Sequence, residues 1–265
     1  MGRPLHFGED TTHVMAIVNL SPESRIRSSV VTSPADALAR ARAFRDLGAS
    51  IIDLGAQSSH FENRSLPPGE EIQRIMPTLE RLVDDDFTVS IDTWKPLVAR
   101  ACVDAGAAIV NDTGGLRDPA MLDVVRTSPV MAVLVHIEAE NPLSVGCRRL
   151  DDGQPRRVAD ALAARVEELR SDGVADVIVD PGLSINYRSD YERYGELQMA
   201  TIRTLSDLAA AGAPVLIPVP RKQEDHRMLA YLTLSIEYGA DIIRVHEVEA
   251  ACDLVRLLGR ELGGT

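Results

Sequence analysis

Short apolar runs alternate with longer, more polar stretches along the whole of this 265-residue chain. Each run holds about four to six residues, mostly β-branched, and such continuous runs are typical of strands covered on both faces. Eight runs are found, at 14–19, 50–55, 88–92, 108–112, 131–136, 176–180, 214–219 and 241–246. A chain that repeats strand and helix in this way is constrained to build a parallel sheet with its helices packed outside.

The stretches between the runs carry the signals of helix ends. The segment "TSPADALARARAFRDLGA" offers Ser33 as N-cap, Pro34 in the first turn and Gly48 after the last turn. A glycine followed by alanine also announces four of the runs, in "GASIID", "GAAIVND", "GAPVLIP" and "GADIIRVH". This phrase indicates a repeated unit in which a helix ends at glycine and a strand begins.

Eight such units in one chain of this length predict a single-domain (β/α)8 TIM barrel spanning residues 1–265. A doubly wound open sheet is the alternative, and the lack of a GxGxxG motif after the first run weakens it. The polar stretch 146–158 is expected to be a loop between the fifth strand and the next helix. Pro218 in the seventh run is unexpected, because proline removes a donor from the strand ladder.

Composition narrows the class of partner and the location. The formal net charge of -12 argues against nucleic acid as a partner, since such binding needs a basic face. No apolar run approaches the roughly 20 residues of a membrane span, so no membrane partner is expected. Three widely separated cysteines, Cys102, Cys147 and Cys252, are typical of free thiols in a reducing compartment. We therefore expect a cytoplasmic protein.

Polar side chains stand at the carboxyl ends of almost all the runs. In a barrel these ends share one mouth, so the side chains there are expected to converge on one cavity. Leaving a buried polar group unsatisfied costs roughly 1–3 kcal/mol, so such a ring implies a ligand or water, although any single member could instead cap a helix. Asp53 and Asp112 are assigned to local turns or other faces. The predicted ring consists of Asn19, Asp92, Asn111, His136, Asp180, Lys222, Arg244 and His246.

The side-chain types in this ring indicate the chemistry of a ligand. Carboxylate and amide edges at Asp92, Asn111 and Asp180 suit a flat heterocycle with adjacent N–H donors, and Lys222 could reach a ring carbonyl or nitrogen. Arg244 and His246 are two residues apart on one strand, so both face the same side, where they suit a phosphate or diphosphate. Asn19 near that anion could also touch a Mg2+. His136 is expected to be structural.

In these residues the chain resembles the dihydropteroate synthase family. The matching segments, in family order, are "MAIVNLSPES", "GASIIDLGAQSS", "VSIDTWKPLVARACVDAGAAIVNDTGGL", "VIVDPG", "VPRKQ" and "ADIIRVHEV". The resemblance implies a transferase of folate biosynthesis that joins 6-hydroxymethyl-7,8-dihydropterin diphosphate to p-aminobenzoate or a related amine with loss of diphosphate. It implies that Asp92, Asn111, Asp180 and Lys222 bind the pterin, and that Asp92, Asp180 and Lys222 are the catalytic residues. Asn19, Arg244 and His246 would bind the diphosphate, and Asn19 its Mg2+.

The chain departs from the family pattern where the p-aminobenzoate pocket and its loops are expected. The departures include Arg25, Gln57, His60, Asn186, Pro220 and Gln223. These changes leave open the alternative of a pterin-binding paralogue without synthase activity. A pterin-dependent methyltransferase of the same barrel superfamily is a third possibility, but it needs no diphosphate, and the Arg244–His246 pair argues against it.

The segment 226–240 carries two apolar stripes on one predicted helix. One runs through Leu229, Leu232 and Ile236, and the other through Met228, Tyr231 and Leu234. Two stripes suit either a homodimer contact, which the family uses, or a thick contact with the core. The sequence thus favours a homodimer without excluding the second interpretation.

Overall fold

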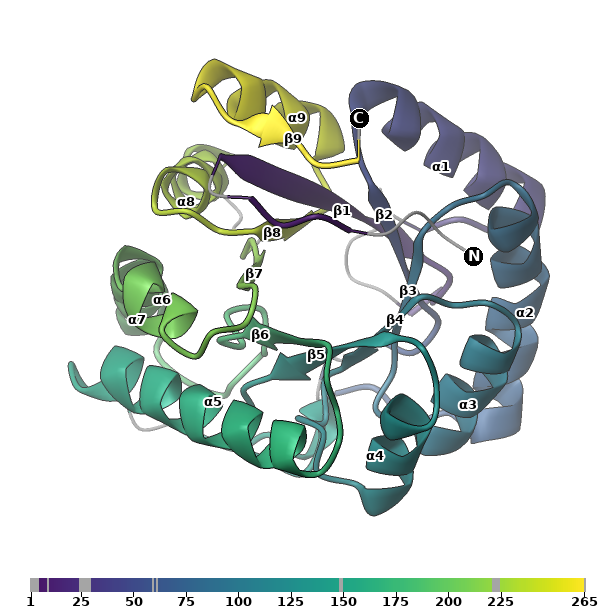
Figure 1. The fold of residues 1–265 in the computed structure, drawn as a ribbon, viewed down its shortest axis with the longest axis horizontal. Helices are drawn as coiled ribbons and strands as arrows, with labels where there is room; N and C mark the ends of the chain where they lie inside the picture. The colour runs from purple at the N-terminus through teal and green to yellow at the C-terminus, as the bar shows by residue number, and fades with distance from the viewer. Residues whose placement is uncertain are drawn as a thin grey trace.

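The protein is a barrel of parallel strands surrounded by helices (Figure 1). The computed structural model describes residues 5–8, 10–23, 30–58, 60, 62–147, 150–220 and 225–264. The barrel strands are β1 (Thr11–Asn19), β2 (Ile51–Gly55), β3 (Val89–Asp92), β4 (Ile109–Asp112), β5 (Met131–Val135), β6 (Val177–Asp180), β7 (Leu216–Pro218) and β8 (Ile242–Val245). All eight coincide with the predicted runs, and the (β/α)8 barrel is confirmed over the open-sheet alternative.

The helices lie outside the strands and follow them in turn (Figure 1). They are α1 (Pro34–Leu47), α2 (Pro68–Asp84), α3 (Pro96–Asp104), α4 (Pro119–Arg126), the 3-10 turn η2 (Pro142–Ser144), α5 (Gln154–Ser171), α6 (Tyr191–Arg203), α7 (Leu205–Ala209), α8 (Asp225–Glu237) and α9 (Val248–Leu257). The predicted caps of α1 are confirmed, since Ser33 accepts from the Asp36 amide and Gly48 has a φ of 117°. In the described ranges, no helix combines the length and apolar character needed to cross a membrane.

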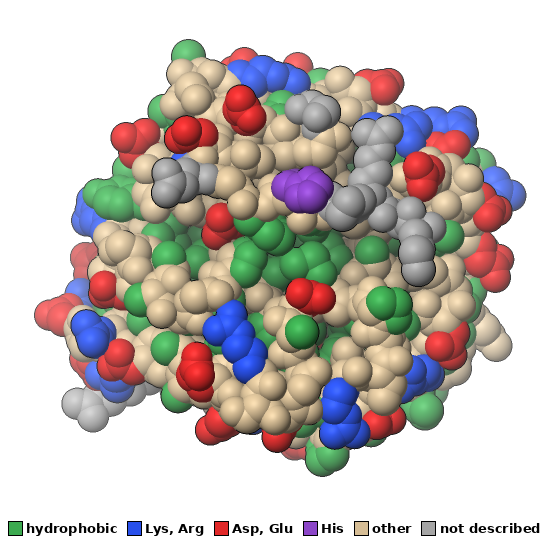
Figure 2. All heavy atoms as spheres, in the orientation of Figure 1, with side chains coloured by type: hydrophobic (Ala, Val, Ile, Leu, Met, Phe, Trp, Pro, Cys, Tyr) green, Lys and Arg blue, Asp and Glu red, His purple; other side chains and the backbone are tan. Residues whose placement is uncertain are grey.

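Alternation along the strands divides the apolar core into two layers. Outward residues such as Ile52, Leu54 and Val110 join the large cluster between strands and helices. Inward residues such as Met15, Ile51 and Ile109 form a smaller cluster inside the barrel. Figure 2 shows hydrophobic side chains gathered in a central hollow of the face seen in Figure 1, ringed by charges of both signs. The inner layer thus fills the barrel at the starts of β2 and β4 and extends past the ends of β5 and β6, through Ile137 and Ile185.

The ring of strands has one weak seam, between β6 and β7. Within the described chain, a single bridge between Val179 and Val215 joins them, whereas each other neighbouring pair forms a ladder. The Val219 amide donates to the Arg244 carbonyl of β8, and successive amides face opposite neighbours, so the nitrogen of Pro218 faces β6. Because β6 and β7 form no ladder there, the missing N–H of Pro218 costs no hydrogen bond, which accounts for a proline in a barrel strand.

Two features at the margins differ from the sequence predictions. Helix α5 begins at Gln154, so the predicted loop 146–158 is wrong in its last five residues. Pro155 lies in the first turn of that helix, where its missing N–H is harmless. A short strand, β9 (Glu261–Leu262), pairs with Thr11 and Thr12 of β1 and was not predicted, since two residues carry no periodic signal.

A substitution at Gly182, just after β6, tests how tightly the backbone is packed at the strand ends. Its φ is 74°, and an added Cβ would overlap the carbonyl oxygen of His136. We expect Gly182→Ala to lower the free energy of unfolding by about 2–3 kcal/mol, because backbone strain and a clash with main chain combine. Gly69→Ala in α2 is the control, since nothing lies within 4 Å of its Cβ position. Equal denaturation midpoints for the two variants would contradict this packing.

Candidate functional site

The guanidinium of Arg244 joins two strands across the inside of the barrel. Its Nε donates to Asp53 Oδ2 at 2.7 Å and its Nη2 donates to Asp92 Oδ2 at 2.7 Å. The three residues come from β8, β2 and β3, and the Asp53 side chain is fully buried. Burial opposes the charge on Arg244, but Asp53 and Asp92 outweigh it and raise the pKa of the guanidinium. The predicted convergence of Asp92 and Arg244 is therefore confirmed.

Asp53 corrects the sequence analysis, which assigned it to a turn or another face. Besides Arg244, its Oδ1 accepts from Ser90 Oγ at 2.6 Å and from Asn111 Nδ2 at 3.4 Å. Asp53 lies two residues after Ile51, which faces the barrel interior, and next to Ile52, which faces the helices. The same alternation that places Ile51 inside also places Asp53 inside, and applying it consistently would have found this residue.

Asp112, also assigned to a turn, does lie in one. It sits one residue past the inward Asn111, and its carboxylate accepts from the amides of Gly114 and Leu116. Burial raises the pKa of Asp112 to about 6, although these two amide donors lower it. Asp112 therefore shapes the β4–α4 connection and contributes no group to the barrel mouth.

Asp180 adds a third carboxylate around the single guanidinium. It ends β6, and its Oδ1 accepts from the Gly182 amide at 2.7 Å. Burial raises the pKa of Asp180 to about 7, and the charges of Asp92 and Asp53 add to this effect against Arg244 and the Gly182 amide. Burial likewise raises the pKa of Asp92 to about 7, although Arg244 lowers it. Three carboxylates facing one cation form a site that favours ligand N–H donors.

Asn111 supplies a further acceptor. Because its Nδ2 faces Asp53 Oδ1, its Oδ1 is turned the other way, and that buried oxygen has no hydrogen-bond partner among the described residues. The buried hydroxyl oxygen of Thr113, just past the end of β4, likewise has no hydrogen-bond partner among the residues that the structure describes. Buried polar atoms are nearly always satisfied, so these two indicate a missing ligand or water.

The remaining predicted residues are distributed as follows. Asn19 ends β1, and its Oδ1 accepts from the Ser21 amide at 2.9 Å. His246 follows β8 and is half-buried. His136 follows β5, and its Nε2 lies 3.7 Å from Glu138 Oε1. Lys222 lies outside the described residues, so its place in the ring stays a prediction.

The positions that depart from the family pattern are partly described. Arg25 and Gln223 lie outside the described residues, whereas His60 is half-buried, Asn186 exposed and Pro220 buried. Between the β5 and β6 ends, Tyr187 is buried and its hydroxyl accepts from the Glu138 amide at 2.9 Å. The β5–α5 and β6–α6 connections are thus tied together by Tyr187, the residue that follows the departure at Asn186.

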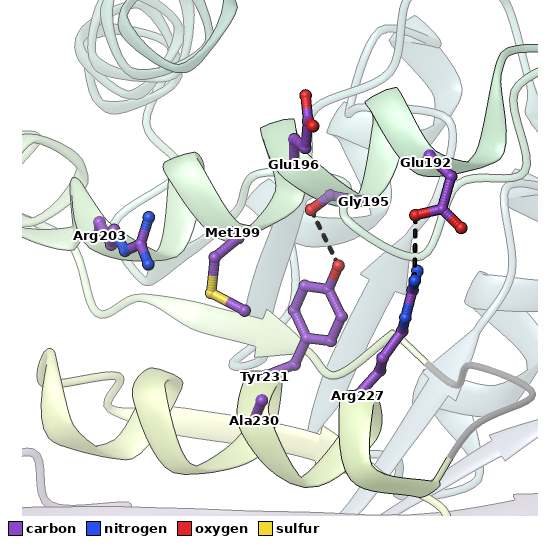
Figure 3. Close-up of a pocket in the computed structure, with 8 residues that line it drawn as sticks. All are labelled: Glu192, Gly195, Glu196, Met199, Arg203, Arg227, Ala230 and Tyr231. Atoms are coloured by element: carbon purple, nitrogen blue, oxygen red, sulfur yellow. Dashed lines mark hydrogen bonds and ion pairs between the residues drawn. The ribbon is translucent and has the colours of Figure 1, made fainter.

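A separate groove of about 350 Å3 lies away from this mouth, between α6 and α8 (Figure 3). Tyr231 donates to the carbonyl of Gly195 across its floor, and Arg227 pairs with Glu192 at one end (Figure 3). None of its lining residues belongs to the predicted ring. The groove therefore marks a junction of two outer helices.

Comparison with known proteins gives one consistent result. The family described as pterin binding enzyme matches residues 15–246. The dihydropteroate synthase of Mycobacterium leprae is 32% identical over 270 residues, covering 93% of this chain and 92% of its own.

Solved structures agree with the relatives. The Xanthomonas albilineans dihydropteroate synthase with 4-aminobenzoic acid has a TM-score of 0.79 at 30% identity, covering 94% of this chain and 92% of that one. The Burkholderia cenocepacia dihydropteroate synthase complexed with 7,8-dihydropteroate has a TM-score of 0.78 at 30% identity, covering 93% and 90%.

Replacing Asp180 by asparagine tests the electrostatics of the site. A raised carboxyl pKa means that the folded chain holds the proton more tightly, so this contribution to stability is present at low pH and lost as pH rises toward 7. The amide of the variant cannot ionise, so its stability lacks this dependence on pH. As pH rises from 5 to 8, the free energy of unfolding of Asp180→Asn should increase by about 1–3 kcal/mol relative to that of the wild type. Denaturant titrations at several pH values measure this, with exposed Asp160→Asn as control. A difference independent of pH would contradict the raised pKa.

Proposed function

The chain belongs to the pterin-binding enzyme family, and from that premise we propose that it acts as a dihydropteroate synthase-type transferase. Its substrates would be 6-hydroxymethyl-7,8-dihydropterin diphosphate and p-aminobenzoate or a related aryl amine. The observation that carries this proposal is the acceptor-rich cluster inside the barrel. There Asp53, Asp92, Asp180 and the partnerless Oδ1 of Asn111 gather around Arg244.

The cluster is suited to a pterin ring. An aminopyrimidinone edge presents adjacent N–H donors, and two parallel hydrogen bonds to one carboxylate orient it. Asp180 and Asp92 are the carboxylates for these donors, and Asn111 Oδ1 accepts a further one. A ligand that donates N–H groups favours the ionised carboxylates, which offsets the burial that raises their pKa values.

In the reaction, the amine nitrogen forms a bond to the methylene carbon of the pterin while the bond from that carbon to the diphosphate oxygen breaks. The amine loses a proton and the diphosphate leaves with the bonding electrons. The residues of the mouth would contribute orientation and electrostatic stabilisation of the leaving group, and no side chain needs to form a covalent bond. Arg244, His246 and Asn19 are the groups proposed for the diphosphate, with Lys222 at the pterin.

A Mg2+ ion fits the donor set at Asn19. The described residues hold no group of three His, Cys, Asp or Glu side chains that could bind a metal alone. Mg2+, however, is commonly held by one or two protein oxygens together with substrate phosphates. The Asn19 Oδ1, which keeps a lone pair beyond its bond to the Ser21 amide, would supply such an oxygen. The bound ion would neutralise diphosphate charge.

The alternative of a pterin-binding paralogue without turnover rests on the departures at His60, Asn186 and Pro220. The comparisons lend it no support, because relatives and structures that cover nearly the whole chain are named as synthases. The two functions differ in one measurement, since both bind the pterin but only one consumes the amine.

The proposed activity is tested by mixing the chain with the pterin diphosphate, p-aminobenzoate and Mg2+ and measuring diphosphate release and pteroate formation. Asn111→Leu should weaken calorimetric affinity for the pterin diphosphate by about tenfold or more, since a lost buried hydrogen bond is worth about 1–2 kcal/mol. Asp160→Asn, on exposed α5, should leave it unchanged. Tight pterin binding without turnover for a panel of aryl amines would favour the paralogue, and absence of pterin binding would reject both.

We further infer a homodimer formed through α8 and α6, in the cytoplasm. Both predicted stripes of 226–240 pack largely into the core, since Leu232, Ile236, Met228 and Tyr231 are buried. Leu229 stays 41% exposed and is the stripe residue available for a contact. Tyr191 of α6, 44% exposed, has its ring centre 5.8 Å from the guanidinium carbon of Arg227, which lines the groove, and Tyr238 just past α8 is 45% exposed. The cytoplasmic assignment is supported by three free cysteines.

Leu229→Glu should convert a dimer into a monomer in sedimentation experiments, because a buried, unpaired carboxylate opposes association. Leu97→Glu and Leu257→Glu are matched controls, since these leucines are 68% and 74% exposed on other helices. A dimer that survives Leu229→Glu but dissociates with either control would place the interface elsewhere.

A further inference from the structure

Behind the strand ends of β2 and β3, a lysine is buried in an ion pair. Lys95 Nζ lies 2.6 Å from Glu71 Oε2, and the two side chains are 10% and 0% exposed. Glu71 Oε1 in turn accepts from Thr93 Oγ1 at 2.9 Å. The family resemblance and the reaction above assign no role to this pair.

The remaining donors of Lys95 reach into the β2–α2 connection, of which residues 56–58, 60 and 62–67 are described. The ammonium group donates to the Leu66 carbonyl at 2.7 Å and to Gln57 Oε1 at 3.3 Å. An ammonium has three N–H donors, so these contacts and the bond to Glu71 use all of them. Each end of the connection is thus tied to one buried charge.

Gln57 completes this arrangement by closing the connection on itself. Its Oε1 accepts from the Leu66 amide at 2.6 Å, and its Nε2 donates to the carbonyls of Ser58 and Arg64 at 3.0 and 3.1 Å. The described residues of the connection belong to no strand, and these side-chain bonds help to hold them. Its shape therefore depends on groups supplied by α2 and the β3–α3 turn.

The connection is close to the candidate site at two places, where it starts after Gly55 and where it contacts the turn after β3. It starts after Gly55, which pairs with Asn19 in the strand register, and a Cβ on Gly55 would lie 3.6 Å from Asp92 Cβ. Thr93 and Lys95 lie one and three residues after Asp92, whose carboxylate is held separately by Arg244. The ion pair thus ties the segment carrying Ser58 and His60 to the turn that follows β3.

Stability alone is a weak reason for such a pair, since the desolvation of two buried charges offsets much of their attraction. We propose that Lys95 and Glu71 are positioning residues that hold the β2–α2 connection against the barrel mouth and thereby set the affinity for the acceptor amine. This inference rests on the proposed function for its kinetic consequence. In the proposed function the pterin is bound by Asp92, Asn111 and Asp180, which are held by Arg244, Asp53 and the Gly182 amide, so its affinity should depend little on the connection.

The test uses the double variant Glu71→Gln, Lys95→Met. Removing both charges avoids an unpaired buried ion, so the variant should fold, but Leu66 and Gln57 lose the donor that anchors them. We expect the KM for p-aminobenzoate to rise about tenfold or more, as small misplacements of binding groups cost up to about 100-fold. The calorimetric Kd for the pterin diphosphate should stay within about twofold. The matched control is Arg156→Met, Asp160→Asn, an exposed i,i+4 pair on α5.

An unchanged KM for the amine, or equal losses for both substrates together with a lower Tm, would overturn the proposal and leave the pair a structural element. Amide exchange at Leu66 gives a readout that needs no activity. Protection at this amide should fall in the double variant and persist in the control, and unchanged protection would overturn the anchoring.

Trp94 reports the same event. It is the sole tryptophan, and Lys95 Nζ lies 5.2 Å from the centre of its ring, so its emission should change when the ammonium is removed. A wild-type chain that binds pterin but turns over no amine would reject the proposed function, while exchange and emission would still decide whether the pair anchors the connection.

Discussion

One guanidinium inside a barrel, shared by carboxylates from different strands, is the interaction on which the organisation of the mouth depends. Arg244 on β8 reaches across to β2 and β3, so the last barrel strand is fixed by charge to two strands from the first part of the chain. Asp180 adds negative charge that no second cation in the described cluster balances. The cluster therefore holds more hydrogen-bond acceptors than its described donors can satisfy, at the position proposed for the pterin.

The apolar layer beneath supports this arrangement. Met15, Ile51 and Ile109 fill the barrel toward the strand starts and exclude water from below the polar groups. Low local polarity strengthens both the attraction within the Arg244 cluster and the cost of an extra charge there. Packing and electrostatics are thus two consequences of the same alternation along the strands.

Much of the fold and of the site could be predicted from the sequence, because the spacing of apolar residues and the capping residues of helices are local signals. The eight strands, the caps of α1 and the inward direction of Asp92, Asn111 and Arg244 followed from them. Asp53 was missed because the alternation was taken to point it away from the mouth, although it is two residues from the inward Ile51 and therefore faces the same side. The two-residue β9 was beyond reach because its pairing is set by tertiary contact alone, and so was the set of partners around Lys95, drawn from three separate segments.

The seam between β6 and β7 has a mechanical consequence. A closed barrel of hydrogen-bonded strands resists any change of its circumference. In this barrel the pairing is weak between β6 and β7, where a single bridge joins Val179 to Val215 within the described chain. Asp180 ends β6 on one side of this seam, and Arg244 lies in β8 on the other side, with β7 between them. A ligand bound by both residues would connect the strands across the seam and make the barrel more rigid. A ligand bound only by β3 and β4 would leave the seam as flexible as before.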